Sequence, residues 1–301
     1  MKQSRSDATF DLLNKLLIIL ITFIMIYPLY FVLIASVSDP YMVSLGKVSV
    51  VPYGLTFEAY RNIFDNGDVW MGYRNSLFYL VAGTSYNLLL TIPAAYVLSK
   101  KRLPLRNAIS WFFFITMFFS GGIVPTYMLM RSLKLTNTPW ALVLGSGVSC
   151  YNLIVARQFF ALSIPEELYE AAKIDGANDY VSFGRVALPL SKPILAIMAL
   201  YYGLGHWNSY YNALIYIQKH EYFPLQLVLR NILLLNQNVA ASLQYTEGLE
   251  AGALQDLARQ AMMANAMKYA LIFIASAPML IAYPFVQRFF VKGVMIGSVK
   301  G

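Results

Sequence analysis

Six long stretches without a charged residue constrain the fold of this chain more than any other feature of its sequence. Each stretch is mostly apolar and 19 to 26 residues long. Because the hydrocarbon core of a bilayer is about 30 Å thick, a helix needs roughly 20 such residues to cross it. The six windows are residues 16–38, 75–99, 107–130, 135–156, 193–218 and 269–287. They predict an all-α polytopic membrane protein, with six transmembrane helices in a single domain over residues 1–301.

The composition excludes an ordinary soluble domain. Only 13% of the residues are charged and 58% are hydrophobic, whereas charged residues make up roughly a quarter of an average soluble domain. A seventh uncharged stretch, residues 231–246, contains several Asn and Gln residues and is too short to span. We expect it to form an amphipathic segment outside the hydrocarbon.

The distribution of Lys and Arg predicts the orientation, because these residues favour the cytoplasmic side of a membrane. With six spans, both termini lie on the same side. If that side is the cytoplasm, the inner segments contain 14 basic residues and the outer segments contain 9. This bias predicts an inner-membrane protein with cytoplasmic termini, a cytoplasmic loop at 157–192 and extracytoplasmic loops at 39–74 and 219–268.

The net charge of +8 is consistent with this orientation and with attraction to anionic membrane lipids. The basic residues form no stripe, and no nucleic-acid-binding motif accompanies them. Nucleic acid is therefore not an expected partner.

The loop at 157–192 carries the most specific signal, and it contains five of the fifteen acidic residues. Ser163, followed three residues later by Glu166, matches a capping box and predicts the start of a short helix. Gly176 is suited to end that helix in the left-handed conformation. A second short helix is expected to begin at Asn178 or Asp179 and to run to Leu188. The sequence therefore predicts a helix-turn-helix bracket on the cytoplasmic face.

The residue spacing in this loop resembles the EAA motif of permease subunits of bacterial ATP-binding-cassette (ABC) importers. In that motif, Glu-Ala-Ala and Gly precede Ile/Val-x-Leu-Pro, as they do here at residues 170–172, 176 and 186–189. The end of the chain, residues 289–301, resembles the terminus of the MalG-like members of carbohydrate importers. The resemblance covers nearly the whole chain and implies the MalG-like type I importer permease fold.

The resemblance also implies the partners. Such a permease forms half of a translocation pathway, pairs with a second permease, usually as a heterodimer, and rests on two cytoplasmic ATPase subunits. It receives its substrate from an extracytoplasmic solute-binding protein. ATP and Mg²⁺ would bind the ATPase subunits, so no cofactor or metal is expected in this chain. The branch most similar to this chain handles complex oligosaccharides, including alginate-type oligouronates.

The resemblance assigns the bracket to coupling with an ATPase subunit. The alternative is that Glu170 is only a solvated helix charge and Gly176 only a helix cap. By the same resemblance, residues 293–301 are expected to reach into the ATPase dimer interface. The coupling residues implied are Glu170, Ala171, Ala172, Asp175, Gly176, Leu188 and Pro189.

Substrate contacts are predicted mainly in the fifth window. Sugars are bound by aromatic faces together with amide and hydroxyl groups, and polar groups at membrane depth are costly unless they face a cavity or another helix. An interfacial aromatic belt and an Asn that bonds the partner permease are the alternatives. The substrate-path candidates are Asn208, Tyr211, Asn212, Trp207 and Tyr201. Further candidates are Tyr86, Asn87 and the 120–122 segment with Pro125.

Two other functional classes fit the sequence less well. A polytopic membrane enzyme would need paired carboxylates, a His-Glu-x-x-His helix or a Ser/His arrangement, and the sequence shows none of these. An ion-coupled secondary carrier for sugars usually places ionisable groups within its spans. All six windows lack Asp, Glu, Lys and Arg, and His206 is the lone histidine near a span. The chain also lacks a phosphate-binding Gly-x-x-x-x-Gly-Lys-Ser/Thr loop, so a separate ATPase is expected.

Overall fold

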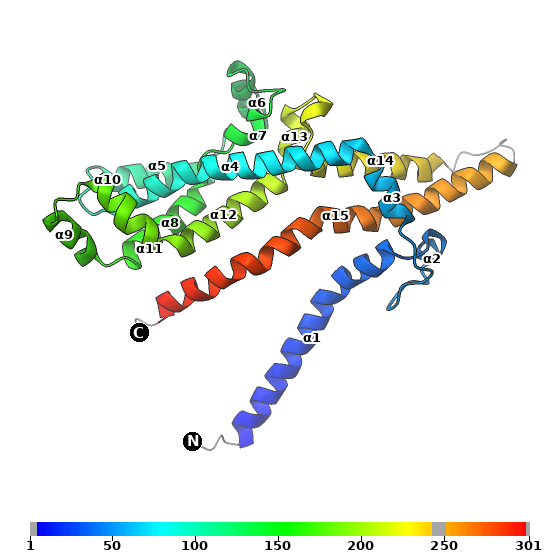
Figure 1. Cartoon of the computed structure of the whole chain (residues 1–301), viewed down its shortest axis with the longest axis horizontal. Helices are drawn as coiled ribbons and strands as arrows, with labels where there is room; N and C mark the ends of the chain where they lie inside the picture. Colours follow the sequence, from blue (N-terminus) through cyan, green and yellow to red (C-terminus); the bar gives the residue numbers. More distant parts are fainter. Residues whose placement is uncertain (1–4, 243–250, 299–301) are drawn as a thin grey trace. The chain divides into compact units, whose positions relative to one another are not determined.

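Helices make up nearly all of the regular structure in the part of the chain that the computed structural model describes, residues 5–242 and 251–298 (Figure 1). No strand occurs within these residues. The described residues group into two compact units. Unit 1 contains the residues up to Gly67 together with Leu229–Ala277, and unit 2 contains Asp68–Val228 and the residues from Pro278 onward.

Unit 1 is built around two long apolar helices, which fit the first and last predicted windows. An aromatic edge contact joins them, since the rings of Phe31 and Tyr269 lie 5.6 Å apart. Tyr60, on a short helix between them in sequence, makes a similar contact with Phe273 at 6.3 Å. Its helices are α1 (Arg5–Ser36), α2 (Pro40–Ser44), α3 (Glu58–Phe64) and most of α15 (Ala251–Ser298), with part of α14 (Leu225–Ser242).

Unit 2 contains the predicted coupling loop and all of the candidate path residues. In Figure 1, the short helices α9, α10 and α11 lie at one end of α4. The elements of unit 2 are α4 (Gly67–Ser99), α5 (Arg106–Phe118), α6 (Ile123–Ser132), α7 (Trp140–Leu144), α8 (Cys150–Leu162), α9 (Glu166–Ile174), α10 (Asp179–Val181), a π-helix η1 (Ser182–Ala187), α11 (Leu188–Leu190), α12 (Lys192–Trp207), α13 (Tyr210–Tyr216) and a 3₁₀-helix η2 (His220–Tyr222).

The core of unit 2 lies where α4, α8 and α12 pack together. Ala95 of α4, Ala156 of α8 and Met198 of α12 are fully buried within one apolar cluster. Small residues at such contacts let helix backbones approach closely, which favours association in a membrane. Gly83 of α4 serves the same purpose, because a Cβ atom there would overlap the ring of His206 on α12.

Three helices of the described residues are long and apolar enough to cross a membrane, namely Thr9–Ser36, Gly67–Ser99 and Arg259–Phe285. Two bent helix pairs also qualify if each pair forms one span. One pair is α5 with α6, bent by 115°, and the other is Asp179–Leu190 with α12, bent by 80°. These five candidates overlap five of the six predicted windows.

The fourth predicted window, residues 135–156, is not one continuous helix. It contains α7 and the start of α8, and residues 145–149 between them are not helical. Gly145 and Gly147 favour this break because glycine is a poor helix former. Ser149 then caps α8, since its side chain accepts a hydrogen bond from the Asn152 amide. A count of uncharged residues detects the apolar stretch but not the break.

Two other windows are also interrupted. The third window bends between α5 and α6, where Gly122 has a φ of 84°. The fifth window ends α12 at Trp207 and continues as α13 after residues 208–209. The predicted amphipathic segment, residues 231–246, is helical as far as Ser242 within α14, and its last four residues lie outside the described part.

Candidate functional site

The break between α7 and α8 is held in place by the buried amide of Asn87 on α4. Its Nδ2 group donates hydrogen bonds to the carbonyl oxygens of Ser146 and Gly147. Its Oδ1 atom lies 2.7 Å from Nε2 of His206 on α12. Because both amide hydrogens of Asn87 are already used, Oδ1 must accept, and the hydrogen-bond network assigns the His206 proton to Nε2.

The other end of the break is held by Tyr202 of α12. The Tyr202 hydroxyl accepts a hydrogen bond of 3.1 Å from the Ser149 amide and lies 2.6 Å from Oγ1 of Thr91 on α4. Its own proton is therefore available to Thr91. Backbone groups without helical partners are tolerated at membrane depth only where protein side chains or a cavity satisfy them. Asn87 and Tyr202 meet that requirement.

A cavity of about 370 Å³ lies beside the break. Its polar wall offers hydroxyl and amide groups, and among the described residues no Asp, Glu, Lys or Arg lines it. The Ser209 hydroxyl in this wall is buried and has no hydrogen-bond partner within the described residues. The lining residues are Asn87, Leu142, Ser146, Val148, Ser149, Asn152, Tyr201, Tyr202, Gly205, His206, Ser209 and Asn212.

The structure brings some of the path candidates to this cavity and places others elsewhere. Tyr201 and Asn212 line it. Trp207 does not, because its side chain is only 1% exposed and its ring packs 6.3 Å from that of Tyr73 in the core. Asn208 and Tyr211 are exposed and lie outside the cavity lining.

Sequence reasoning did not single out Ser149 or Asn152 as lining residues. The Gly-Ser-Gly run at 145–147, inside an otherwise apolar window, was the available signal for a break. Asn87 was named as a path candidate, and the structure gives it a scaffolding contact as well as a place in the cavity wall.

The coupling loop forms the predicted bracket, with one correction. Helix α9 begins after Pro165, without a side-chain cap, and Ser163 instead ends α8. The predicted capping box is therefore wrong, because Ser163 is still bonded to the preceding helix through its amide and the Phe159 carbonyl. Gly176 has the expected left-handed φ of 82°.

The second helix of the bracket starts where the sequence predicts. The Asn178 side chain accepts a hydrogen bond of 2.9 Å from the Val181 amide. The segment continues through the π-turn of η1 to Leu190, so Pro189 lies inside its final turn. It is two residues longer than the predicted end at Leu188.

Most of the EAA residues are exposed on the surface of unit 2. Glu170, Ala171, Asp175 and Gly176 are exposed, and Ala172 is half-buried. Leu188 is half-buried and Pro189 is exposed at the far end of the bracket. The first half of the motif thus presents an acidic surface with small side chains, which a partner can approach closely.

One side chain fixes α9 to the rest of unit 2. Tyr169 is the only buried residue of α9, and its ring lies 6.0 Å from that of Tyr96 on α4. Nζ of Lys100, just after α4, lies 2.9 Å from the centre of the Tyr169 ring. This geometry is a cation–π contact. The Tyr169 hydroxyl is buried without a hydrogen-bond partner among the described residues, so the ring makes the attachment.

Burial lowers the pKa of Lys100 to about 8, because lost hydration outweighs the attraction of Glu166 and Asp179. Lys100 therefore remains mainly cationic at neutral pH. Burial also raises the pKa of the Tyr169 hydroxyl, so this ring stays neutral. Neither residue was identified from the sequence, because only the folded bracket brings residues 100 and 169 together.

Comparison with known proteins identifies the family. Residues 69–296 match the sequence profile described as "binding-protein-dependent transport system inner membrane component". The chain belongs to this family. It is therefore a multi-pass inner-membrane permease subunit of an ABC importer, working with another permease, ATPase subunits and a binding protein. It is a transport subunit and not an enzyme.

Individual relatives agree over nearly the whole length. The chain is 36% identical to Protein LplC of Bacillus subtilis over 304 residues, which covers 100% of this chain and 98% of LplC. It is 34% identical to the polygalacturonan/rhamnogalacturonan transport system permease protein YtcP of the same species, covering 97% of this chain and 98% of YtcP. The arabinooligosaccharides permease AraQ of Halalkalibacterium halodurans is 29% identical, with 93% of each chain covered.

A solved structure confirms the fold. The crystal structure of a bacterial ABC transporter involved in the import of the acidic polysaccharide alginate matches with a TM-score of 0.82 and 29% identity. The match covers 96% of this chain and 99% of that one. The all-α type I permease fold predicted from the sequence is thus confirmed.

We predict that Tyr202→Phe destabilises the assembled permease, because it removes the hydrogen bonds to Thr91 and Ser149. Interhelical hydrogen bonds in membranes contribute about 0.6 kcal/mol on average and up to about 1.7, so a loss of about 1–2 kcal/mol is expected. The thermal midpoint of the purified complex measures it. Tyr201→Phe, one residue away on the cavity wall, is the matched control and should leave the midpoint unchanged. Equal midpoints for Tyr202→Phe and wild type would contradict the assigned network.

We predict that Lys100→Met loosens α9. A cation–π contact contributes about 0.5–1 kcal/mol at a partly exposed site, so amide hydrogen exchange in residues 166–174 should accelerate about two- to fivefold. Lys101→Met, at the neighbouring exposed position, is the control and should leave exchange in α9 unchanged. If both variants exchange like wild type, Lys100 does not fix this helix.

Proposed function

We propose that this permease forms one half of the translocation pathway for an oligosaccharide that contains acidic sugar units, of the polygalacturonan or alginate type. The observation that carries the proposal is the cavity beside the α7–α8 break, whose wall carries amide, hydroxyl and phenol groups. Such groups suit hydrogen bonding to sugar hydroxyls.

Two further facts support an acidic substrate. Ser149, the N-cap of α8, and Asn152 in its first turn line the cavity, and the N-terminus of a helix favours a carboxylate. Among the relatives, YtcP is named for polygalacturonan and rhamnogalacturonan, and the solved importer transports alginate. The uncharged wall also leaves the sugar weakly held, which suits passage rather than storage.

We further propose that the partner permease is a different chain, so that the pathway is a heterodimer. Two ATPase subunits would bind ATP and Mg²⁺, and this chain would hold no cofactor or metal. The exposed motif residues Glu170, Ala171, Asp175 and Gly176 would dock into one of these subunits. The excess of basic residues in the expected inner segments supports cytoplasmic termini.

The substrate path is tested by Asn152→Leu in the complete importer reconstituted with its binding protein. We expect uptake of labelled oligogalacturonate or oligoalginate to fall about fivefold or more, because one hydrogen bond contributes about 1 kcal/mol. Asn208→Leu, at an exposed position outside the cavity, should transport normally. If Asn152→Leu keeps full uptake while Asn208→Leu loses it, the path does not run through this cavity.

Coupling is tested by the double variant Glu170→Lys with Gly176→Pro. The charge reversal removes a pairing group, and proline replaces a residue whose φ of 82° it cannot adopt. We expect the ATPase subunits to be lost on co-purification and uptake to stop. Glu167→Lys, an exposed acid on the same helix but outside the motif, is the control. Intact association and uptake in the double variant would show that the bracket does not dock.

A further inference from the structure

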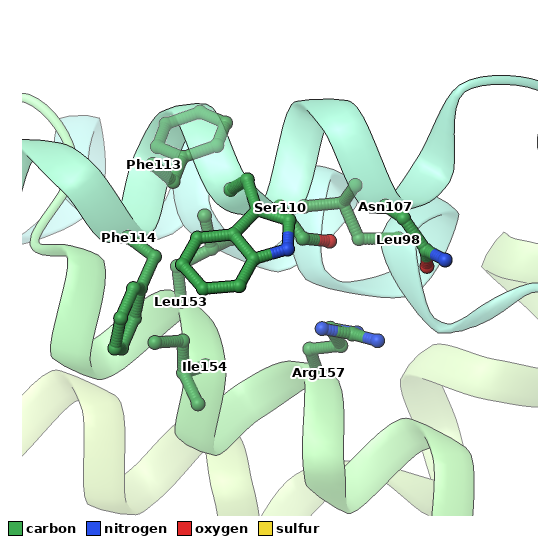
Figure 2. A pocket seen from close by; sticks show the side chains of 9 residues that line it. Leu98, Asn107, Ser110, Phe113, Phe114, Leu153, Ile154 and Arg157 are labelled. Carbon is green, nitrogen blue, oxygen red and sulfur yellow. The ribbon is translucent and has the colours of Figure 1, made fainter.

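A second cavity of about 370 Å³ lies between α5 and α8, apart from the proposed path (Figure 2). On α5, Asn107, Trp111 and Phe114 share one helix face, following the i, i+4, i+7 spacing. On α8, Ile154 and Arg157 lie one turn apart and face them. Both helices therefore contribute to a crevice with two unlike ends.

The two ends differ in polarity. Figure 2 shows the Arg157 guanidinium and the Asn107 amide toward one end, and Phe114 and Ile154 toward the other. Trp111 also lines the crevice and lies between Asn107 and Phe114 along α5. Asn107 lies in the first turn of α5, and Arg157 lies one turn after Ile154 on α8. The two polar residues therefore come together at the same end of the crevice. The crevice is thus amphipathic along its length.

The positive charge of Arg157 at the polar end favours binding of an anion. Arg157 is half-buried, and within residues 5–242 and 251–298 it forms no ion pair within 4 Å. A guanidinium beside apolar walls is costly without a partner of opposite charge. The segment that leads into α5 adds further positive charge and no acid, since residues 100–106 contain Lys100, Lys101, Arg102 and Arg106.

The apolar end of the crevice is suited to a hydrocarbon chain. Trp111 is 61% exposed and Ile154 is 38% exposed in this chain, so both present uncovered surface to the crevice. An acyl chain covers such a groove without needing hydrogen-bond partners. A free phosphate or a soluble anion would satisfy Arg157 but leave this surface uncovered.

We propose that the crevice binds an anionic phospholipid. Its phosphate lies between Arg157 and Asn107, and one acyl chain follows Trp111 toward Phe114 and Ile154. Basic pockets between membrane helices recognise anionic headgroups in this way. The lipid would bridge α5 and α8, and α8 leads directly into the coupling loop. This inference is independent of the substrate proposed above.

The test uses the complete importer, purified from bacterial membranes and mildly delipidated, with bound lipid quantified by native mass spectrometry. We expect retained phosphatidylglycerol to fall about fivefold in Arg157→Met, because one basic residue contributes about 1 kcal/mol to anionic lipid binding. Arg157→Lys should keep most of the lipid. Arg131→Met, which removes an exposed charge on α6 outside the crevice, should retain the wild-type amount.

A photocrosslink identifies the occupant even if Arg157→Met assembles poorly. With p-benzoylphenylalanine at position 114, we expect an adduct with the mass of a phospholipid, formed more from phosphatidylglycerol than from phosphatidylcholine nanodiscs. An adduct with the partner permease would overturn the proposal and assign the crevice to the subunit interface. Equal labelling by both lipids, or wild-type retention in Arg157→Met, would also overturn it.

Discussion

The need to satisfy backbone polar groups in an apolar environment governs the centre of this permease. Residues 145–149, between α7 and α8, are not helical. Water is not freely available to such backbone groups at membrane depth. Asn87 and Tyr202 replace the missing helical hydrogen bonds there. These two side chains stabilise the non-helical segment 145–149, and both also line the cavity beside it.

The same two helices connect the cavity to the coupling loop. Helix α8 runs from the break to Leu162, and α12 runs from Lys192 to Trp207, so both border the cavity at one end and the bracket at the other. Both helices pack with α4 in one continuous apolar core. Under the proposed coupling, a displacement of the bracket would reach the polar wall through these packed helices, as in rigid-body transitions.

The sequence was sufficient for features that depend on composition or on local spacing, and insufficient for those that depend on distant contacts. Uncharged windows located the long helices, and the spacing from Glu170 to Pro189 located the bracket and identified the family. The break at 145–149 was missed because its partners lie on other helices. Trp207 was expected on the path because aromatic faces bind sugars. In the folded chain its ring is instead buried against Tyr73. Lys100 and Tyr169 meet only once the bracket has folded.

The single-point attachment of α9 determines what the bracket can transmit. Within this helix only Tyr169 is buried, and a cation–π contact of about 1 kcal/mol is small beside the burial of the α4–α8–α12 core. If an ATPase subunit binds the exposed face around Glu170, as proposed above, it could tilt α9 about the Tyr169 ring at little cost. It cannot translate α9 far without moving α4 as well, because the ring is held between Tyr96 and Lys100. Under the proposed coupling, the bracket would therefore absorb rotation and transmit displacement, which is the component of motion that α8 and α12 would carry to the cavity.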